Sequence, residues 1–261
     1  MIGLSKTHTI QNRESLIDLA RTYNVGYNEI TAANAGIDPW VPDEGTDITI
    51  PTAWILPESS REGMVVNLAE MRLYYFFSVE EKNYVSTFPI GIGAEGFGSP
   101  TGEFIITAKV KDPVWRVPGN IRQEKPELPP YVLPGPENPL GGYWLQLSVN
   151  GYGIHGTNRP YGIGRRVSHG CIRLYPEDIE MLFSLVRPGI KVRIVEEPVK
   201  TDIIDNRVFI EVHQSEKEED EELLTRAVEN LGRKRLLEHV DTPSLIQAIK
   251  NATGLPAVIS R

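Results

Sequence analysis

The segment from Asp112 to Gly142 constrains the fold more than any other stretch, because proline recurs throughout it. Its prolines stand at positions 113, 118, 126, 129, 130, 134, 136 and 139. Proline lacks a backbone N–H, so we expect this segment to contain neither a helix nor an inner strand. Long irregular segments in compact domains are usually functional or disordered. Trp115, Tyr131 and Tyr143 supply apolar anchors, so we predict an ordered flap over a site, with a mobile surface loop as the alternative.

The overall composition is that of a globular protein and excludes some classes of partner. The 261 residues, 40% of them hydrophobic and 24% charged, leave room for more than one unit. A formal net charge of −8 argues against nucleic acid as a partner. No apolar run approaches the ~18 residues of a membrane span. The N-terminus lacks the basic start and apolar core of a signal peptide, which fits either a cytoplasmic protein or an exported one whose signal has been removed.

Local patterns divide the chain into four parts, and together they predict the α+β fold class. Residues 1–51 read as a strand, two helices and a strand. Residues 52–62 are polar and turn-forming, which is typical of a linker. Residues 63–198 contain many short strands punctuated by glycine and proline, which predicts a β-rich domain. Residues 199–261 are expected to form a small α-helical extension, packed on the domain before it. Within them, 207–212 is a candidate strand, and the acidic run at 216–222 is solvated or disordered.

The stretch Gly153–Leu174 gathers the chemistry of the chain. It contains the only cysteine, Cys171, and two of the five histidines, His155 and His169. Asn150-Gly151 is a strong hairpin signal, so we expect His155 near the end of the returning strand. A helix is predicted to begin at Pro176, directly after the cysteine.

A lone cysteine is more often a small buried apolar residue than a nucleophile. Here His169 and Arg173 flank it, and such cations are expected to lower the pKa of the thiol. His155 on the neighbouring strand can take the proton as a general base. Backbone N–H groups around Gly170 and Cys171 can face an oxyanion.

A zinc site made by His155, His169 and Cys171 is the alternative to a catalytic thiol. No second cysteine or carboxylate ligand stands near these residues in the sequence. We therefore expect neither a metal nor a cofactor.

Two runs around these residues resemble the signature of the YkuD-type L,D-transpeptidases. The runs are I-H-G-T-N at 154–158 and S-H-G-C-I-R-L at 168–174, and in the family a histidine precedes an [ST]-H-G-C-x-[NR] block. The runs P-I-G-I-G, S-P-T-G-E-F and P-G-P-E-N-P-L-G extend the resemblance, over residues 63–198, to the ErfK/YbiS/YcfS/YnhG branch of Gram-negative bacteria. The resemblance implies a mixed sheet, similar to a β-sandwich, that cradles the helix after the cysteine.

Residues 8–51 resemble a LysM domain, through L-x-x-L-A-R-x-Y, A-A-N-A and the closing I-T-I-P. Gln11-Asn12-Arg13-Glu14 stands where that family has P-G-D-T, near the loop that holds N-acetylglucosamine. The resemblance implies a peptidoglycan-binding module, and a packing domain that no longer binds sugar is the alternative.

The YkuD resemblance also implies a reaction. Cys171 would attack a peptidoglycan stem tetrapeptide, release the terminal D-alanine and form a thioester, which an amine of a second stem peptide or of a lipoprotein would resolve. His155 would be the general base, oriented by the backbone carbonyl of Gly156, and His169 with Gly170 would shape the oxyanion pocket. The expected substrate contacts are Arg173, Ser168, Trp115, Tyr143 and Arg165, with Arg166 as a further candidate.

Other functions remain open from the sequence. Water in place of the amine would make the protein an L,D-carboxypeptidase, and a third alternative is a non-catalytic wall-binding protein that works through its LysM module. Family members are inactivated by carbapenems, and their substrate lies outside the cytoplasm. The resemblance therefore favours a periplasmic or envelope protein with its signal removed.

Overall fold

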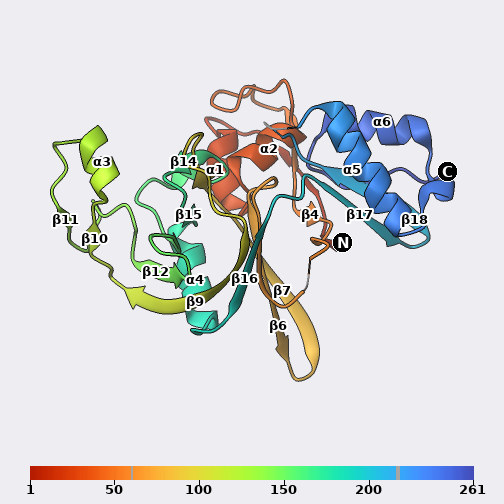
Figure 1. Ribbon diagram of the computed structural model, residues 1–261. Helices are drawn as coiled ribbons and strands as arrows, with labels where there is room; N and C mark the ends of the chain where they lie inside the picture. Colours follow the sequence, from red (N-terminus) through yellow and green to blue (C-terminus); the bar gives the residue numbers. More distant parts are fainter. Residues whose placement is uncertain (60, 216–217) are drawn as a thin grey trace. The chain divides into compact units, whose positions relative to one another are not determined.

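The computed structural model describes residues 1–59, 61–215 and 218–261 (Figure 1). Residue 60 of the expected linker and residues 216 and 217 of the acidic run lie outside the described residues. The described chain forms two compact units, one of residues 1–59, 67–71 and 195–261 and the other of residues 61–66 and 72–194. The expected α+β class is confirmed. Within the described part of the chain, no helix is both long enough and apolar enough to cross a bilayer.

The second unit is built on an eight-stranded mixed sheet with the order β15-β13-β12-β9-β16-β5-β6-β7. β6 and β7 pair over their full length and continue outward as a twisted hairpin (Figure 1). The strand bounds are β5 Gly63–Asn67, β6 Arg72–Val79, β7 Lys82–Pro89, β9 Gly102–Lys111, β12 Tyr143–Leu147, β13 Gly153–His155, β15 Ile172–Arg173 and β16 Lys191–Val195. β13 and β15 are parallel, whereas β9 pairs antiparallel with both β12 and β16.

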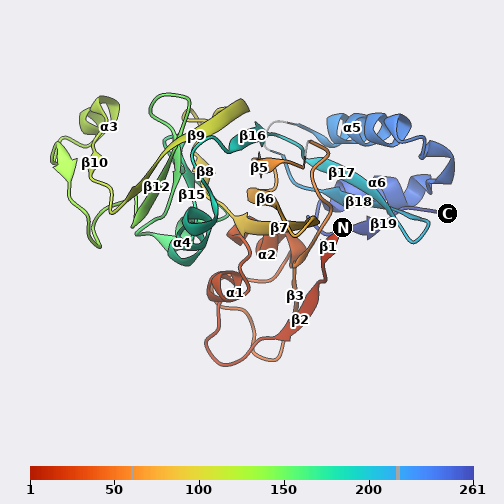
Figure 2. The same cartoon turned by 90° about the horizontal axis from the view of Figure 1, so that it is seen from below.

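Helix α4 (Pro176–Leu185) packs against β12 and follows the cysteine directly, as expected (Figure 2). Pro176 occupies its first turn, where a missing N–H costs nothing. Ile179 and Leu182 are its buried apolar residues. Lys109 of β9 donates to the carbonyl oxygens of Phe183 and Val186 at 2.5 and 2.7 Å, so a cation satisfies the C-terminal end of the helix.

The proline-rich segment is ordered, and the expectation that it contains no helix is wrong. Helix α3 (Gly119–Glu124) occupies the longest proline-free window, between Pro118 and Pro126. β10 (Trp115–Arg116) and β11 (Tyr131–Val132) form a two-stranded ribbon around it. The Asn138 side chain closes the segment by donating to the Pro113 carbonyl at 2.7 Å. Proline density therefore limits the length of elements here without preventing them.

The first unit contains the expected strand, two helices and strand, namely β2 (Lys6–Thr9), α1 (Leu16–Thr22), α2 (Tyr27–Ala33) and β3 (Asp47–Ile50). Ser15 caps α1 by accepting the N–H of Asp18 at 3.1 Å. The expected linker is partly structured, because β4 (Ala53–Trp54) pairs with β1 (Ile2–Gly3) and Trp54 is buried.

Residues 199–261 contain the candidate strand at 207–212, but they are less helical than expected. They contain a three-stranded antiparallel sheet of β17 (Val199–Ile204), β18 (Arg207–Val212) and β19 (Ala257–Val258). Helices α5 (Asp220–Arg233) and α6 (Thr242–Asn251) pack against it (Figure 1). Their apolar residues are buried with those of the sheet in one core. These residues form one compact unit with residues 1–59 rather than an appendage of the preceding strands.

Candidate active site

Cys171 lies immediately before β15, the edge strand of the eight-stranded sheet. β15 runs parallel to β13, and His155 is paired with Arg173. Residues two apart in a strand share a face, and paired residues on neighbouring strands share it too. This register puts the imidazole and the guanidinium on one face of the sheet edge, and the charge of Arg173 acts on both the imidazole of His155 and the thiol of Cys171.

Cys171 is half-buried, and this reverses one expectation. Burial raises the pKa of Cys171, while a backbone hydrogen bond from Gly153 and the charge of Arg173 lower it by less. The prediction that nearby cations lower the pKa of this thiol is therefore wrong for the net shift, although Arg173 acts in the predicted direction. The proton stays on sulfur until a base removes it, and Sγ lies 3.7 Å from the carbonyl oxygen of Gly151.

His155 is neutral and rigidly oriented. Its Nδ1 lies 2.6 Å from the carbonyl oxygen of Gly156, so Nδ1 carries the proton and Nε2 presents a lone pair. Burial and the charge of Arg173 lower the pKa of His155 to about 3. The ring of Trp144 stacks on the imidazole at a centroid distance of 5.5 Å. An imidazole in this state is able to accept the proton of a thiol.

The turn from Ser168 to Cys171 is stabilised by the hydroxyl of Ser168 and by the backbone conformation of Gly170. The Ser168 hydroxyl donates to the carbonyl oxygen of Cys171 at 2.5 Å and accepts the N–H of Gly170 at 3.1 Å. Gly170 has a φ of +100°, and a Cβ there would lie 2.5 Å from the ring of Tyr152. The Gly170 N–H is thus already engaged. Its part in the site is to form the turn, and the role of oxyanion donor that the sequence suggested for it is not supported.

Arg173 offers an unused donor beside the thiol. Its backbone is fixed by two 2.8 Å hydrogen bonds with Gly91. Burial lowers the pKa of the Arg173 guanidinium. A negative charge on Cys171 acts in the opposite direction and offsets part of this shift. Its Nε is buried and has no acceptor in the described part of the chain. Such a donor is suited to the carboxylate of a ligand.

The remaining expected substrate contacts are not all brought to this site. Tyr143 donates its hydroxyl to Glu180 of α4 at 2.8 Å, on the face of β12 opposite Trp144 and hence opposite His155. Trp115 lies in the ribbon of the flap, paired with Val132. Arg165 lies half-buried in the loop before β14 (Arg166–Ser168), with its carbonyl oxygen accepting the N–H of Ile92.

The zinc alternative does not match the geometry, because its three side chains are engaged separately. His155 bonds to Gly156, and Nε2 of His169 lies 3.2 Å from Glu124. Among the described residues, the one group of three side chains close enough to share an ion is Glu70, Glu211 and His213. The ammonium of Lys200 already fills that position, 2.6 Å from Glu70 and 2.7 Å from Glu211.

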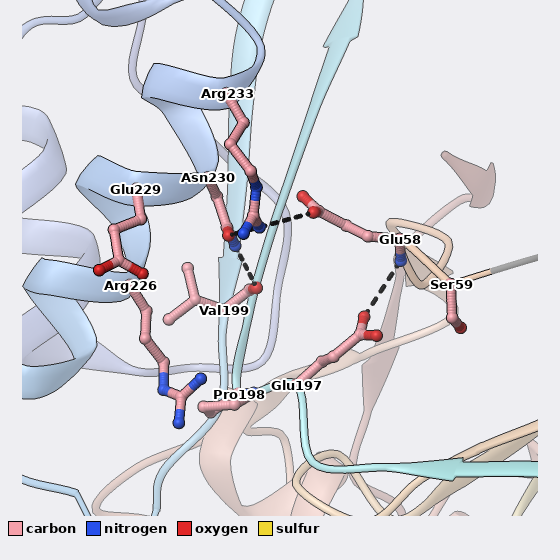
Figure 3. Close-up of a pocket in the computed structure, with 9 residues that line it drawn as sticks. All are labelled: Glu58, Ser59, Glu197, Pro198, Val199, Arg226, Glu229, Asn230 and Arg233. Carbon is pink, nitrogen blue, oxygen red and sulfur yellow. Dashed lines mark hydrogen bonds and ion pairs between the residues drawn. The ribbon is translucent and has the colours of Figure 1, made fainter. Parts of the chain in front are cut away.

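A pocket in the first unit contains no nucleophile or imidazole (Figure 3). It has a volume of about 280 Å³, and its wall includes Glu58, Glu197 and Arg233. Arg233 lies 3.2 Å from the carboxylate of Glu58, and the N–H of Glu58 donates to Glu197 at 3.0 Å (Figure 3). These pairs tie the segment at residue 58 to α5, so the pocket has a structural explanation.

Sequence reasoning missed two residues that shape the site. Trp144 covers the imidazole, and Gly153 makes room for it, since a Cβ at Gly153 would lie 2.4 Å from the indole ring. The signal was a glycine in the predicted returning strand, two residues before His155 and therefore on the same face as the imidazole. Glu124 and Phe97, which contact His169, had no local signal, because they come from distant segments.

The raised pKa of Cys171 gives a test of this electrostatic arrangement. We expect the rate of alkylation by iodoacetamide, followed by intact mass, to rise with pH around a midpoint above the ~8.5 of a free cysteine. Arg173→Gln removes the cation that favours the thiolate, so it should move the midpoint higher. The exposed-loop variant Glu95→Gln is the control and should leave it unchanged. A wild-type midpoint below that of free cysteine would show a resting thiolate instead.

Comparison with known proteins identifies the family. The YkuD family model, an L,D-transpeptidase catalytic domain, matches residues 61–194, and the LysM domain model matches residues 8–51. The chain is 39% identical to the probable L,D-transpeptidase YcfS of Escherichia coli K12, across the whole chain and 85% of that protein. It is 38% identical to the probable L,D-transpeptidase YbiS of the same strain, across 98% of the chain and 87% of that protein.

A solved structure is also similar to part of the chain. The NMR structure of the catalytic domain from the E. faecium L,D-transpeptidase is 24% identical, with a TM-score of 0.40, and the match covers 53% of this chain and 99% of that one. On the strength of the family model and the full-length relatives, the chain belongs to the YkuD-type L,D-transpeptidases and has a LysM domain before its catalytic domain.

Proposed function

We propose that this protein is a peptidoglycan L,D-transpeptidase that works through a thioester on Cys171. The observation that carries the proposal is that Arg173, which is paired with a neutral and oriented His155, also acts by its charge on the chain's only thiol. A thiol and a base in this relation are the minimum for nucleophilic acyl transfer.

In the acylation step, Nε2 of His155 takes the thiol proton as Sγ of Cys171 attacks the carbonyl carbon that precedes the terminal D-alanine. The C–N bond to D-alanine then breaks, and the imidazolium returns the proton to the leaving amine. Because His155 resists protonation, the imidazolium exists only briefly and its proton is given up readily. The product of this step is a thioester on Cys171 and free D-alanine.

In the second step, an acceptor amine attacks the thioester carbonyl and gives its extra proton to His155. The C–S bond breaks, sulfur recovers the proton, and a new amide links the two peptides. A direct crosslink between stem peptides and attachment to a lipoprotein differ only in the amine. Through the unpaired Nε of Arg173, we assign a substrate carboxylate to the position beside the thiol.

The LysM domain fits this proposal as a holder of the glycan while the thiol acts on the peptide. Its Trp40 is 59% exposed, on a turn where Asp38 accepts the N–H groups of Trp40 and Val41 at 2.8 and 3.1 Å. Exposed aromatic rings on rigid turns are common contacts for bound ligands. Because the proposed substrate is peptidoglycan, the proposal implies that the protein acts in the periplasm or cell envelope.

Product analysis tests the proposal directly. Incubation of the full chain with a disaccharide-tetrapeptide is expected to give crosslinked dimers and free D-alanine in equal amounts, measured by mass spectrometry. Tripeptide monomers without dimers would mean that water resolves the thioester and the protein is an L,D-carboxypeptidase. Adding a lysine-terminated peptide as a competing amine tests the lipoprotein type of acceptor.

A carbapenem supplies an independent check on the thioester. We expect the intact protein to gain the mass of one carbapenem molecule, because the thiol opens the lactam ring without losing a fragment. A protein that reacts with iodoacetamide but neither with the carbapenem nor with the tetrapeptide would contradict the proposal.

A further inference from the structure

The end of flap helix α3 lies against the turn that carries the nucleophile. Glu124 is the last residue of α3, and its Oε2 lies 3.2 Å from Nε2 of His169. His169 stands two residues before Cys171. The same imidazole packs on the ring of Phe97, at a centroid distance of 4.5 Å and an angle of 54°. His169 is thus fixed between an aromatic ring of one loop and a carboxylate of the flap.

The flap helix is too short to hold its position by itself. A helix of six residues is unstable in isolation, so its place depends on what it contacts. Ile121 anchors it from within the flap, being 9% exposed. Glu124 and His169 remain 44% and 32% exposed, so water screens the pair. Contacts of this kind are weak enough to open when a substrate arrives.

The catalytic turn is therefore supported from two sides. Ser168 fixes the backbone of Gly170 and Cys171 from within the turn. His169 projects from the middle of the turn to the flap and connects the position of α3 to that of the nucleophile. A movement of the flap changes the restraint on this one side chain.

We propose that Glu124 is a positioning residue that latches the flap helix over Cys171 through His169. The latch shields the thiol in the resting protein and holds the flap where it contacts the acyl donor. Glu124 acts through His169 and touches no reacting atom. The part of the proposal that concerns the acyl donor rests on the proposed transpeptidase function, whereas the shielding of the thiol does not.

Two measurements on the full chain test the latch. Glu124→Ala should alkylate with iodoacetamide about two- to fivefold faster than wild type at one fixed pH, the range expected when a part-exposed ion pair is lost. The same variant should raise KM for the tetrapeptide by a similar factor and leave kcat within about twofold. Glu124→Gln keeps an acceptor for His169, so its values should fall between those of wild type and Glu124→Ala.

Glu127→Gln is the matched control, because it neutralises an exposed carboxylate of the same flap. It should match wild type in both measurements. Unchanged alkylation in Glu124→Ala, or alkylation that becomes slower, overturns the latch, and so does an unchanged KM. If wild type itself makes no product from the tetrapeptide, the proposed function fails, and the alkylation rates alone then decide whether the flap shields the thiol. Equal melting temperatures of the variants exclude misfolding as the cause of a difference.

Discussion

Replacing Cys171 with alanine is expected to remove product formation from the tetrapeptide and leave the fold intact. The chain has no other thiol, so no neighbouring residue can form the thioester. Loss of a nucleophile in comparable hydrolases costs at least ~10⁴-fold in kcat. The measurement is single-turnover and steady-state product formation by mass spectrometry, with wild type and variant at equal concentration.

The variant is expected to fold like wild type, because Cys171→Ala removes only one sulfur atom. Cys171 is followed by strand β15, and its Sγ makes only weak polar contacts with the backbone, among them one of 3.7 Å to the carbonyl oxygen of Gly151 and a hydrogen bond from Gly153. Removing one sulfur atom there should change the free energy of unfolding by no more than about 1 kcal/mol. The variant should also lose all reaction with iodoacetamide and with a carbapenem. Product formation within tenfold of wild type by a folded variant would rule out the thioester.

Cys171→Ser separates nucleophilicity from shape. A hydroxyl fits the position, but it holds its proton more tightly than a thiol does. His155, whose pKa is lowered to about 3, is a weak base and is poorly suited to removing that proton. We therefore expect serine to rescue little of the activity. A serine variant near wild-type activity would mean that the site activates its nucleophile in another way.

The local order of the site could be predicted from the sequence, because adjacent residues determine it. Asn150-Gly151 fixes a hairpin, and the hairpin places His155 opposite a residue of the preceding strand. Pro176 and the acidic residues after it fix where α4 begins. The sequence did not show which face of β12 lies next to His155. Tyr143 and Trp144 are equally aromatic, and only the register with β13 shows that Trp144 covers the imidazole.

The sequence also could not predict the net pKa shift of Cys171, because burial and nearby cations change it in opposite directions. Near Cys171 the sequence shows cations, which lower the pKa of a thiol, but it does not show how deeply the thiol is buried. The prediction that the proline-rich segment contains no helix was wrong for a related reason. Proline prohibits specific positions, and the six residues of α3 fit between two of them. Contacts such as that of Glu124 with His169 join residues 45 positions apart and leave no local pattern.

Lys200 is the clearest example of a residue whose role the sequence does not reveal, because no local pattern indicates that it is buried. Its side chain is fully buried, as are Glu70 and Glu211, whose carboxylates lie 2.6 and 2.7 Å from Nζ. Burial alone would lower the pKa of Lys200, but the two carboxylates together raise it. Glu211 also accepts the N–H of Ile55 at 2.5 Å. One ammonium therefore joins the segment after the LysM domain, the turn at residue 70 and the C-terminal sheet.

Lys200→Met is expected to destabilise the first unit by about 3–5 kcal/mol, because it removes the ammonium between two buried carboxylates and leaves His213 as the basic group beside them. The measurement is urea denaturation combined with hydrogen exchange, in which the amides of β17, β18 and Ile55 should lose protection together. The stabilisation also depends on pH. Glu211 has a lowered pKa and Lys200 a raised one, so the contribution should be present between about pH 4.3 and 10.4, the unfolded-state pKa values of Glu and Lys, and decline outside that range.

Two comparisons decide whether burial causes the effect. Lys191 pairs with Glu62 at 2.9 Å, but both side chains are more than 60% exposed, so Lys191→Met should cost less than about 1 kcal/mol. Adding Glu70→Gln and Glu211→Gln to Lys200→Met removes the unpaired charges, and it should restore part of the lost stability. If Lys200→Met costs no more than Lys191→Met, the cluster does not hold the C-terminal residues to the segment after the LysM domain. If it costs the expected amount and the triple variant recovers, the extension that matches neither family model has a physical role, which is to supply the lysine that unites this unit.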